Sequence, residues 1–455
     1  MLSIPLLRQG IETTSRDTRI LHAVTGTPLA TVHEAPALLT RLSVKRMRTA
    51  APPPPREESA AALAEAGRRF AKTTLAGLSP DEYAELQALS SGVPVRAALR
   101  TLRRLDEECA LLGHVVAEQQ PVGATAQGRA RWSRRGSVLG VVAPSNHPGT
   151  HVAWLQAIAL GYRVAVRPGA RDPFTPQRLA HALLDVGLDP DRISVLAGPH
   201  AAADALTDTA DLALVYGGES TVARLRGSDR VLVRGPGRSK ILVDGPVDDD
   251  LLDHLVAEIA DDGGVRCTNA TAVFTSGDHL ALAEALAARL AALAVLPVTD
   301  PGAVLPVRPL AEARALRAAV GRAAEGAPDL AQRHYGADAT PVVDGEGAAL
   351  RPAVVPVDRP DHPALATELP FPCVWVAPWR PSDGIAPLTG SLALTLLTEN
   401  KRLVDTALDD PTVRTVIHGR VPGWWQDPYL PHDGYIGQFL GEVRGHAAPV
   451  RGEQI

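Results

Sequence analysis

Between residues 137 and 233 the sequence repeatedly alternates short apolar runs with stretches of helical periodicity, and this alternation constrains the fold more than any other feature. The apolar runs predict strands at 138–143, 163–166, 193–196, 212–216 and 231–233. The stretches between them predict helices at 150–160, 176–186 and 220–225. Strands joined in this way pair in parallel, so the pattern predicts a doubly wound α/β sheet whose ligands bind at the carboxyl ends of its strands.

The length of the chain requires more than one domain. A chain of 455 residues with 45% apolar content is too long for a single core and suggests two or three domains. Four consecutive prolines, Pro52 to Pro55, cannot continue a helix or a sheet and mark a boundary. The predicted units are a strand-rich N-terminal appendage at 1–50, the alternating domain at 56–245 with a hairpin at about 120–136, a second α/β domain at 246–425, and a C-terminal segment at 426–455.

Composition narrows the class of protein. A net charge of −5 and a pI near 6.3 do not suggest a nucleic-acid binder. Three cysteines cannot make a disulfide framework, which favours a reducing, cytoplasmic location. The N-terminal apolar stretch is too short for a signal peptide, and no apolar run is long enough to predict a membrane span.

One cysteine follows a glycine pair. Asp261-Asp262-Gly263-Gly264-Val265-Arg266-Cys267 precedes an apolar run, and backbone N–H groups freed by such a turn can lower a thiol pKa and hold an oxyanion. Cys267 is therefore a candidate nucleophile, with a buried structural thiol as the alternative. Cys109 and Cys373 lie in helical and strand-like apolar runs and are expected to be core residues.

Several short motifs occur in a fixed order along the chain. Pro144-Ser145-Asn146-His147-Pro148 follows the first strand, Arg167-Pro168 follows the second, and Cys267 comes later. The supporting motifs are Val215-Tyr216-Gly217-Gly218-Glu219, Gly235-Pro236-Gly237-Arg238-Ser239-Lys240, Glu368-Leu369-Pro370-Phe371-Pro372 and Pro431-His432-Asp433-Gly434. In this order they resemble the aldehyde dehydrogenase superfamily over roughly residues 60–450. The likeness is greatest to the branch that reduces acyl thioesters, which includes acyl-CoA reductases and CoA-acylating aldehyde dehydrogenases.

This resemblance implies an architecture and an assembly. The expected fold is α/β, with two Rossmann-like parallel-sheet domains and a β element for oligomerisation, in a homodimer or homotetramer. The first domain would bind the dinucleotide, and the second would carry the cysteine, with the active site in the cleft between them.

The resemblance also implies catalytic roles. Cys267 would be the nucleophile, and Asn146 would donate its side-chain amide to the oxyanion beside the Cys267 backbone N–H. The alternative for Asn146 is a cap on the helix that begins near Thr150. His147 is expected at the start of that helix. His147 and His151 have no acidic residue or third histidine beside them, so we expect no metal site.

For the cofactor, the resemblance implies a set of contacts in the loops after the strands. The predicted cofactor-binding residues are Pro144, Ser145, Arg167, Pro168, Arg171, Gly217, Gly218, Glu368 and Phe371. Gly217 and Gly218 lead into a helix whose N-terminus can hold a pyrophosphate, although they are equally consistent with an ordinary turn. Ala170 stands where NAD-preferring members place a glutamate, and arginines flank it, which favours NADP(H) over NAD(H). Glu368 matches its family counterpart only if Pro370 is an insertion.

The segment 232–237 bears on the direction of the reaction. Hydrolytic family members carry a glutamate before a glycine pair there, and this chain has Leu-Val-Arg-Gly-Pro-Gly. Without a general base, a thioester acyl-enzyme hydrolyses slowly and stays open to hydride, which predicts reduction of an acyl-CoA or carrier-protein thioester to an aldehyde. Three alternatives remain: another base such as Asp261, Asp262 or Glu368; an ordinary enzyme that oxidises aldehydes to carboxylic acids; and a catalytically silent member acting as a partner subunit.

Two further clusters allow two interpretations each. Four arginines surround Trp132 and form either a binding site for a phosphate-bearing substrate or a solvated hairpin surface. They are Arg129, Arg131, Arg134 and Arg135. The C-terminal aromatic residues line either an acyl pocket or a subunit interface. These residues are Trp424, Trp425, Tyr429, Tyr435 and Phe439.

Overall fold

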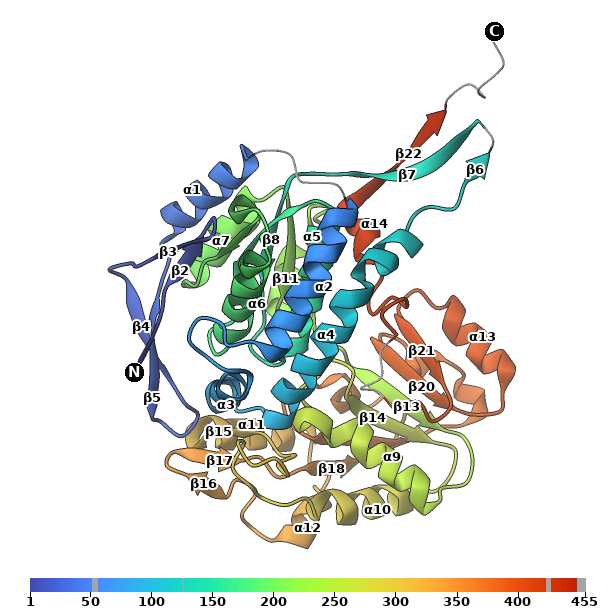
Figure 1. Cartoon of the computed structure of the whole chain (residues 1–455). Coiled ribbons are helices and arrows are strands. Elements are labelled where there is room, and N and C mark those ends of the chain that lie inside the picture. Colours follow the sequence, from blue (N-terminus) through green and yellow to red (C-terminus); the bar gives the residue numbers. More distant parts are fainter. Residues whose placement is uncertain (51–55, 126, 423–426, 448–455) are drawn as a thin grey trace.

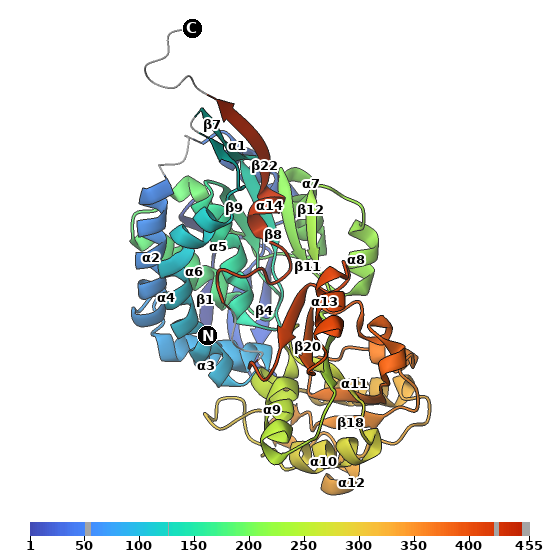
Figure 2. The same cartoon turned by 90° about the vertical axis from the view of Figure 1, so that its right-hand side faces the viewer.

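The computed structural model describes residues 1–50, 56–125, 127–422 and 427–447. Two α/β halves, each built on its own largely parallel sheet, lie against one another, and a β ribbon projects from the first half (Figures 1 and 2). The α/β fold predicted from the alternating pattern is therefore confirmed. The proline run Pro52–Pro55 and the residues Trp424 and Trp425 lie outside the described residues.

The first sheet has the order β12-β11-β8-β9-β10-β2-β3. Its parallel strands are β8 (Val138–Val142), β9 (Arg163–Arg167), β10 (Ile193–Val195), β11 (Leu212–Tyr216) and β12 (Val231–Arg234). The strands β2 (Leu6–Arg8) and β3 (Ile11–Thr13) extend the sheet in antiparallel pairing beyond β10. Leu6 and Leu7 are fully buried in the main core.

The N-terminal segment is thus part of this domain, and the prediction of a separate appendage at 1–50 was wrong. Its other strands, β1 (Leu2–Ile4), β4 (Thr18–His22) and β5 (Pro28–His33), form a small sheet of their own. Residues 37–48 form helix α1 (Ala37–Arg48), where strands were expected. Thr40, Ser43, Val44 and Met47 are the buried residues of α1, and they fall on one helical face.

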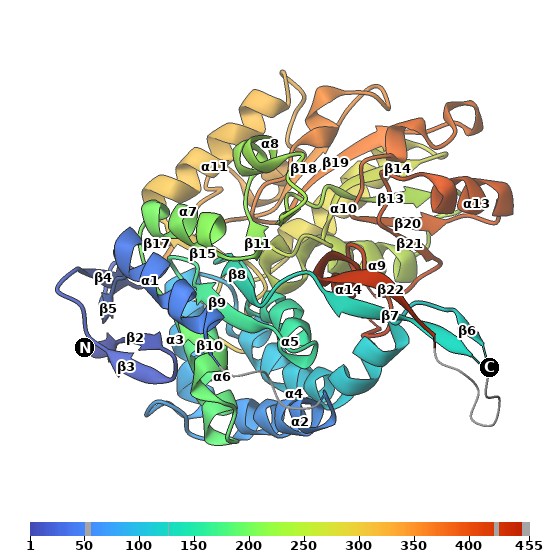
Figure 3. The same cartoon turned by 90° about the horizontal axis from the view of Figure 1, so that it is seen from above.

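Helices cover both faces of the first sheet (Figure 3). One face carries α2 (Arg56–Lys72), α4 (Val95–Glu118), α5 (Val152–Ala159) and α6 (Phe174–Asp185), and the other carries α1 and α7 (His200–Thr209). Helix α3 (Pro80–Ser91) begins with the predicted capping box, in which Ser79 and Glu82 bond each other's backbone N–H. Helix α8 (Glu219–Leu225) follows β11.

The second sheet has the order β18-β19-β14-β13-β20-β21, with all pairs parallel. Its strands are β13 (Ser239–Val243), β14 (Ala270–Thr275), β18 (Ala353–Pro356), β19 (Cys373–Pro378), β20 (Ala393–Leu397) and β21 (Thr415–His418). Since β13 pairs with β14 and β20, the second domain begins before residue 246, earlier than predicted. The strand belongs here because its side chains are buried between the cores of this half.

Smaller elements complete the second half. Its helices are α9 (Asp249–Ala260), α10 (His279–Ala291), α11 (Leu310–Ala323), α12 (Ala331–Tyr335) and α13 (Lys401–Asp409). A small antiparallel sheet consists of β15 (Val307–Pro309), β16 (Val342–Asp344) and β17 (Gly347–Ala349). The projecting ribbon, called the β7–β22 ribbon below, joins β6 (Ala124–Thr125) and β7 (Gly128–Arg134) to β22 (Gly441–Ala447), which follows α14 (Ile436–Leu440).

Candidate active site

A cavity of about 1090 Å³ lies where the two halves and the C-terminal segment meet. That volume exceeds what a typical drug-sized ligand needs. Its lining includes Cys267, Asn146, Gly217, Gly218 and Glu368. The fold therefore gathers residues that are far apart in the sequence into one cavity at the carboxyl ends of the β8 and β11 strands.

The backbone in front of Cys267 requires its glycines. After α9 ends, Asp262, Gly263 and Gly264 have positive φ angles of 52°, 80° and 63° in succession. A Cβ on Gly264 would lie 2.6 Å from the backbone nitrogen of Pro372. The predicted glycine turn is confirmed, and it carries the chain around a tight left-handed bend toward the cavity.

The carbonyl of Cys267 is held against the start of β13. The Ser239 hydroxyl donates to the Cys267 carbonyl oxygen at 2.8 Å. A Cβ on Gly237 would lie 1.9 Å from that same oxygen, so only glycine permits this approach. The Gly-Pro-Gly stretch thus has a structural role. It lets residues 261–267, which carry the candidate nucleophile Cys267 and are called the nucleophile loop below, pack directly on the neighbouring turn.

The side chain of Asn269 closes the loop from within. Its Oδ1 accepts from the Arg266 backbone N–H at 2.8 Å, and its Nδ2 donates to the carbonyls of Glu258 and Asp261 at 3.0 and 3.2 Å. One buried amide therefore ties the end of α9 to the residues that flank Cys267.

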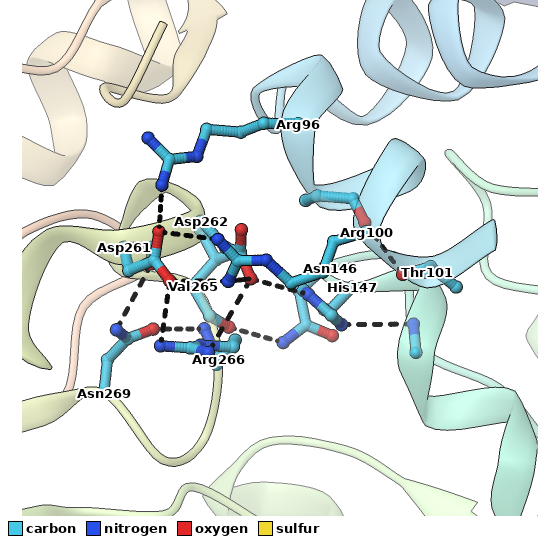
Figure 4. A network of polar contacts seen from close by, with 12 residues as sticks. Arg96, Arg100, Thr101, Asn146, His147, Asp261, Asp262, Val265, Arg266 and Asn269 are labelled. Atoms are coloured by element: carbon cyan, nitrogen blue, oxygen red, sulfur yellow. Dashed lines mark hydrogen bonds and ion pairs between the residues drawn. The ribbon is translucent and has the colours of Figure 1, made fainter. Parts of the chain in front are cut away.

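The two aspartates before the glycines are bound into an ion-pair network with α4 (Figure 4). Asp261 accepts from Arg96 at 2.7 Å and from Arg100 at 2.5 Å, and Asp262 accepts from Arg100 at 3.3 Å. The imidazole of His147 lies 3.3 Å from Asp262. This network joins the first half of the molecule to the nucleophile loop of the second.

Asp262 is held as a carboxylate by these contacts. Burial alone would raise its pKa, but the hydrogen bond and charge of His147, with the charges of Arg266 and Arg100, hold the pKa well below its usual range. Neither Asp261 nor Asp262 lies on the cavity lining. The hypothesis that one of them activates water was therefore wrong, because both are committed to arginine partners.

Asn146 faces the nucleophile loop. Its Nδ2 donates to the Val265 carbonyl oxygen at 2.8 Å, which uses one of the two amide protons. The helical turn that follows is capped by His147, whose Nδ1 accepts from the Gly149 N–H, as expected for an imidazole at a helix start. The structure thus excludes the capping alternative for Asn146 and places its amide beside the cavity that Cys267 lines.

A histidine that was not among the predicted site residues contacts Cys267. Nε2 of His432 lies 3.4 Å from Sγ of Cys267. Burial and the charges of Arg234 and Arg104 lower the pKa of His432 to about 3. Burial, followed by the charge of Glu368, raises the pKa of Cys267 to about 11, against the opposing effect of Arg234. At neutral pH a neutral thiol therefore faces a neutral imidazole.

Glu368 lies on the cavity lining, whereas Phe371 does not. Glu368 lines the cavity, and its carboxylate accepts from the backbone N–H groups of Arg238, at 2.7 Å, and Gly237, while burial raises its pKa. Phe371 is 1% exposed and packs in the core of the second half, with the Arg317 guanidinium 5.9 Å from its ring centre. The predicted cofactor contact of Phe371 does not agree with this position.

The glycines after β11 and β12 suit a dinucleotide. Gly217, Gly218 and Gly235 line the cavity beside Pro144. A Cβ on Gly218 would meet no atom within 4 Å and would fill space at the start of α8. Bare backbone at a strand-to-helix turn lets a phosphate approach N–H groups closely. These residues therefore fit the nicotinamide and pyrophosphate end of such a cofactor.

The residues predicted for the adenosine end lie off this cavity. The Arg167 guanidinium donates twice to the Gly198 carbonyl, at 3.0 and 2.7 Å. Arg171 makes a two-pronged pair with Glu312, at 3.2 and 2.5 Å, and its backbone N–H donates to Ser145. Each guanidinium therefore has a protein partner in this conformation, and Pro168 is buried beside them.

The basic cluster and the C-terminal aromatic residues differ in their position relative to the cavity. The basic cluster is not on the cavity lining; Arg129 and Arg131 are exposed on β7, which agrees with the solvated hairpin surface. Tyr435 lines the cavity, whereas Tyr429 is 36% exposed. Within the described ranges, no group of three or more metal-ligating side chains comes together, and no helix is long and apolar enough to cross a membrane.

Comparisons with known proteins agree with the fold. The family model described as "Aldehyde dehydrogenase family" matches residues 11–385. Similar solved structures include the gamma-glutamyl-gamma-aminobutyraldehyde dehydrogenase of Burkholderia cenocepacia J2315 (16% identity, 99% of this chain, 97% of that chain, TM-score 0.80) and PnpE from Pseudomonas sp. WBC-3 (16%, 100%, 99%, 0.82). An NAD+ complex of an aldehyde dehydrogenase from Bacillus cereus is another (18%, 99%, 97%, 0.79). No curated protein sequence matches the chain significantly.

Proposed function

The chain belongs to the aldehyde dehydrogenase family of NAD(P)-dependent oxidoreductases that act on aldehydes, and on that premise we propose that it reduces an acyl thioester to an aldehyde. The observation that carries this proposal is the residue at the end of β12. There Arg234 lines the cavity and donates to the Tyr216 hydroxyl at 3.2 Å. A guanidinium keeps its proton at any physiological pH, so it cannot take one from water.

The carboxylates on the described cavity lining have other partners. Glu108 pairs with Arg104, Asp433 lies 3.5 Å from Arg414, and Asp427 accepts from the Tyr429 backbone N–H. Glu368 is held by the backbone N–H groups of the Gly-Pro-Gly turn. A thioester on Cys267 would therefore meet no carboxylate committed to activating water, which supports a long-lived acyl-enzyme.

The proposed reaction uses few residues of the chain. The Cys267 sulfur attacks the thioester carbonyl, and Asn146 with the Cys267 backbone N–H stabilises the oxyanion. The thiol of the substrate leaves, and Cys267 holds the acyl group. Gly217 and Gly218 would hold a reduced nicotinamide cofactor, whose chemistry would supply the hydride. The resulting thiohemiacetal anion collapses to the free aldehyde, and the Cys267 thiolate that is released takes up a proton from water to restore the thiol.

The cavity favours an apolar acyl chain. Its wall on the side of α4, α5 and the C-terminal segment carries an aliphatic group beside the polar residues Arg104, Glu108, Gln119 and Gln156. The aliphatic residues are Leu112, Val115, Val152, Ala153, Leu430 and Ile436. The aliphatic part of this wall removes the apolar surface of a bound acyl chain from water. We propose an acyl-CoA or a carrier-protein thioester with an aliphatic acyl group as the substrate.

Aldehyde oxidation to a carboxylic acid is the second candidate. The solved structures above are described as aldehyde dehydrogenases, and Glu368 is a carboxylate that lines the cavity. Burial raises the pKa of Glu368, which would suit a general base if it left its backbone partners.

A paired assay separates the two functions. A series of acyl-CoA thioesters is offered with NADPH or NADH, and the matching aldehydes are offered with NADP+ or NAD+ in the absence of thiol. The proposal expects free thiol, aldehyde and oxidised cofactor in equal amounts from the thioester. Efficient acid formation from the aldehyde without thiol, together with no thioester turnover, would establish the second candidate instead.

We also propose a preference for NADP(H). Ala170 places no carboxylate near the adenosine ribose, and Arg171 lies one residue away. Exchange of its Glu312 partner for a 2′-phosphate would keep the guanidinium paired. Arg171→Ala is expected to weaken NADPH binding about tenfold, which corresponds to about 1.4 kcal/mol, and to leave NADH binding nearly unchanged.

Fluorescence titration of both cofactors measures this effect, with Glu312→Gln as the control. The control keeps Arg171 and removes its competing charge, so NADPH should bind at least as tightly as to the wild type. An equal loss for NADPH and NADH in Arg171→Ala would contradict the proposed preference.

The β7–β22 ribbon is proposed to join two copies of the chain. Strand β22 is an edge strand of the projecting ribbon (Figure 1). Its residues 442–447 are exposed, and Val443 is 55% exposed. An exposed edge strand is a template for pairing with another strand. Val443→Asp is expected to halve the mass in solution, measured by light scattering. Val342→Asp, at a 56% exposed valine on β16, should leave the mass unchanged. An unchanged mass in both variants would refute this interface.

A further inference from the structure

A histidine of the C-terminal segment, His432, lies next to the sulfur of Cys267. His432 lies 165 residues along the chain from Cys267, and its Nε2 is 3.4 Å from Sγ. Its position is fixed by the second sheet, since the Thr415 hydroxyl at the start of β21 donates to the His432 carbonyl at 3.1 Å. Asp433 next to it lies 3.5 Å from Arg414. Because the His432 backbone is bonded to β21, the fold itself holds the imidazole next to Cys267.

We propose that His432 is the general base of Cys267 and returns the proton to the departing thiol. The inference rests on the proposed function only in that Cys267 attacks a carbonyl carbon. The imidazole is the titratable side chain that the structure places within hydrogen-bond distance of Sγ among the described residues. The arginine at the end of β12 cannot accept a proton, so the base must come from another element.

Cys267 and His432 are both neutral before the reaction, so the proton that must move is the one on Sγ of Cys267. As the Cys267 Sγ–H bond breaks, its proton passes to Nε2 of His432, the sulfur forms a bond to the carbonyl carbon, and the carbonyl electrons move to oxygen. When the tetrahedral adduct collapses, the bond to the substrate sulfur breaks. The proton on Nε2 passes to that sulfur, and His432 is neutral again.

The charges around Cys267 and His432 favour proton transfer during the attack of the sulfur on the carbonyl carbon. They disfavour a stable thiolate–imidazolium ion pair. Arg234 and Arg104 oppose a protonated His432, and Glu368 opposes a Cys267 thiolate. Arg234 and Arg266 act in the other direction on Cys267 and stabilise negative charge on its sulfur. The environment therefore keeps the resting thiol unreactive and supports charge as it develops during attack.

Acylation of Cys267 by p-nitrophenyl acetate, without cofactor and without thioester, tests the inference. His432→Ala and His432→Gln are expected to slow the burst of p-nitrophenolate by about 10²- to 10⁴-fold. Added imidazole should restore part of the rate in His432→Ala, where space is vacated, and much less in His432→Gln. His114→Ala, at an exposed histidine on α4, should react at the wild-type rate.

The outcomes separate this inference from the proposed function. A loss of acylation with imidazole rescue supports His432 as the base even if the enzyme turns out to oxidise aldehydes. Wild-type acylation rates in both folded variants would overturn the inference and leave thioester reduction open. If His432→Ala fails to fold, His432→Gln preserves the size of the side chain. The wild-type burst in D₂O then gives an independent measurement, since an unchanged rate would contradict proton transfer in the step of attack.

Discussion

Replacing Cys267 with alanine is expected to lower turnover by about 10⁴-fold or more, because loss of a covalent nucleophile removes the acyl-enzyme route entirely. The fold should survive, since Cys267 is only half-buried and its fixed group is the backbone carbonyl that accepts from Ser239. Steady-state kinetics with an acyl-CoA, together with the melting temperature and cofactor binding of the variant, give the comparison.

The other cysteines provide the matched controls. Cys109 and Cys373 are 2% and 5% exposed, and burial raises the pKa of both thiols, that of Cys373 to about 12. Cys109→Ala and Cys373→Ala should lose some stability by leaving small cavities, but they should retain the acylation of Cys267. A Cys267→Ala variant that kept more than a tenth of wild-type turnover would show that another group is the nucleophile.

Replacing Asp262 with alanine is expected to lower the free energy of unfolding by about 3–5 kcal/mol, because it leaves the guanidinium of Arg100 facing the loop without one of its carboxylates. Asp262 is 1% exposed, so solvent does little to compensate. Alanine would also have to adopt the positive φ of 52° at this position, which adds strain. Urea unfolding measures the change, and turnover should fall as the nucleophile loop loosens.

The control for Asp262 is a similar pair at the surface. Asp253 pairs with Arg289 but is 71% exposed, so Asp253→Ala should cost less than about 1 kcal/mol. Asp262→Asn keeps a residue that tolerates positive φ and should be less harmful than alanine. If Asp262→Ala and Asp253→Ala lowered the free energy of unfolding equally, the network between α4 and the nucleophile loop would contribute no more to stability than a surface ion pair.

The same aspartate predicts a pH dependence. The pKa of Asp262 is lower in the folded protein than the value of about 3.9 expected for an unfolded chain. Its contribution to stability is therefore fully present above pH 4 and is lost as the pH falls toward the folded pKa. The stability difference between wild type and Asp262→Asn should shrink as the solution is acidified below pH 4.

The nucleophile loop and the first sheet could be predicted because local sequence determines them. Gly263 and Gly264 are required by positive φ, and the alternating apolar runs determine which residues become strands. Ser79 and Glu82 cap α3 through contacts only three residues apart. In each case the residues that cause the structure lie within a few positions of it, so a short sequence pattern is enough to predict it.

The rest depended on partners far along the chain. The guanidinium of Arg171 was expected to face a cofactor, but Glu312, on α11 of the other half, is its partner. His432 belongs to the Pro431-His432-Asp433-Gly434 motif, yet no neighbouring residue in the sequence indicates that the C-terminal segment returns to Cys267. The burial of Leu6 and Leu7 likewise follows from the pairing of β2 with β10, which only the tertiary structure reveals.

The fate of a preformed acyl-enzyme tests the account most directly. The enzyme is loaded with one equivalent of an aliphatic acyl-CoA, freed of excess thioester, and followed by intact-protein mass spectrometry with product analysis, with and without NADPH. We predict that the acyl group stays on Cys267 without reduced cofactor and is released as aldehyde once NADPH is added. Rapid release of the carboxylic acid before any cofactor is present would contradict the account.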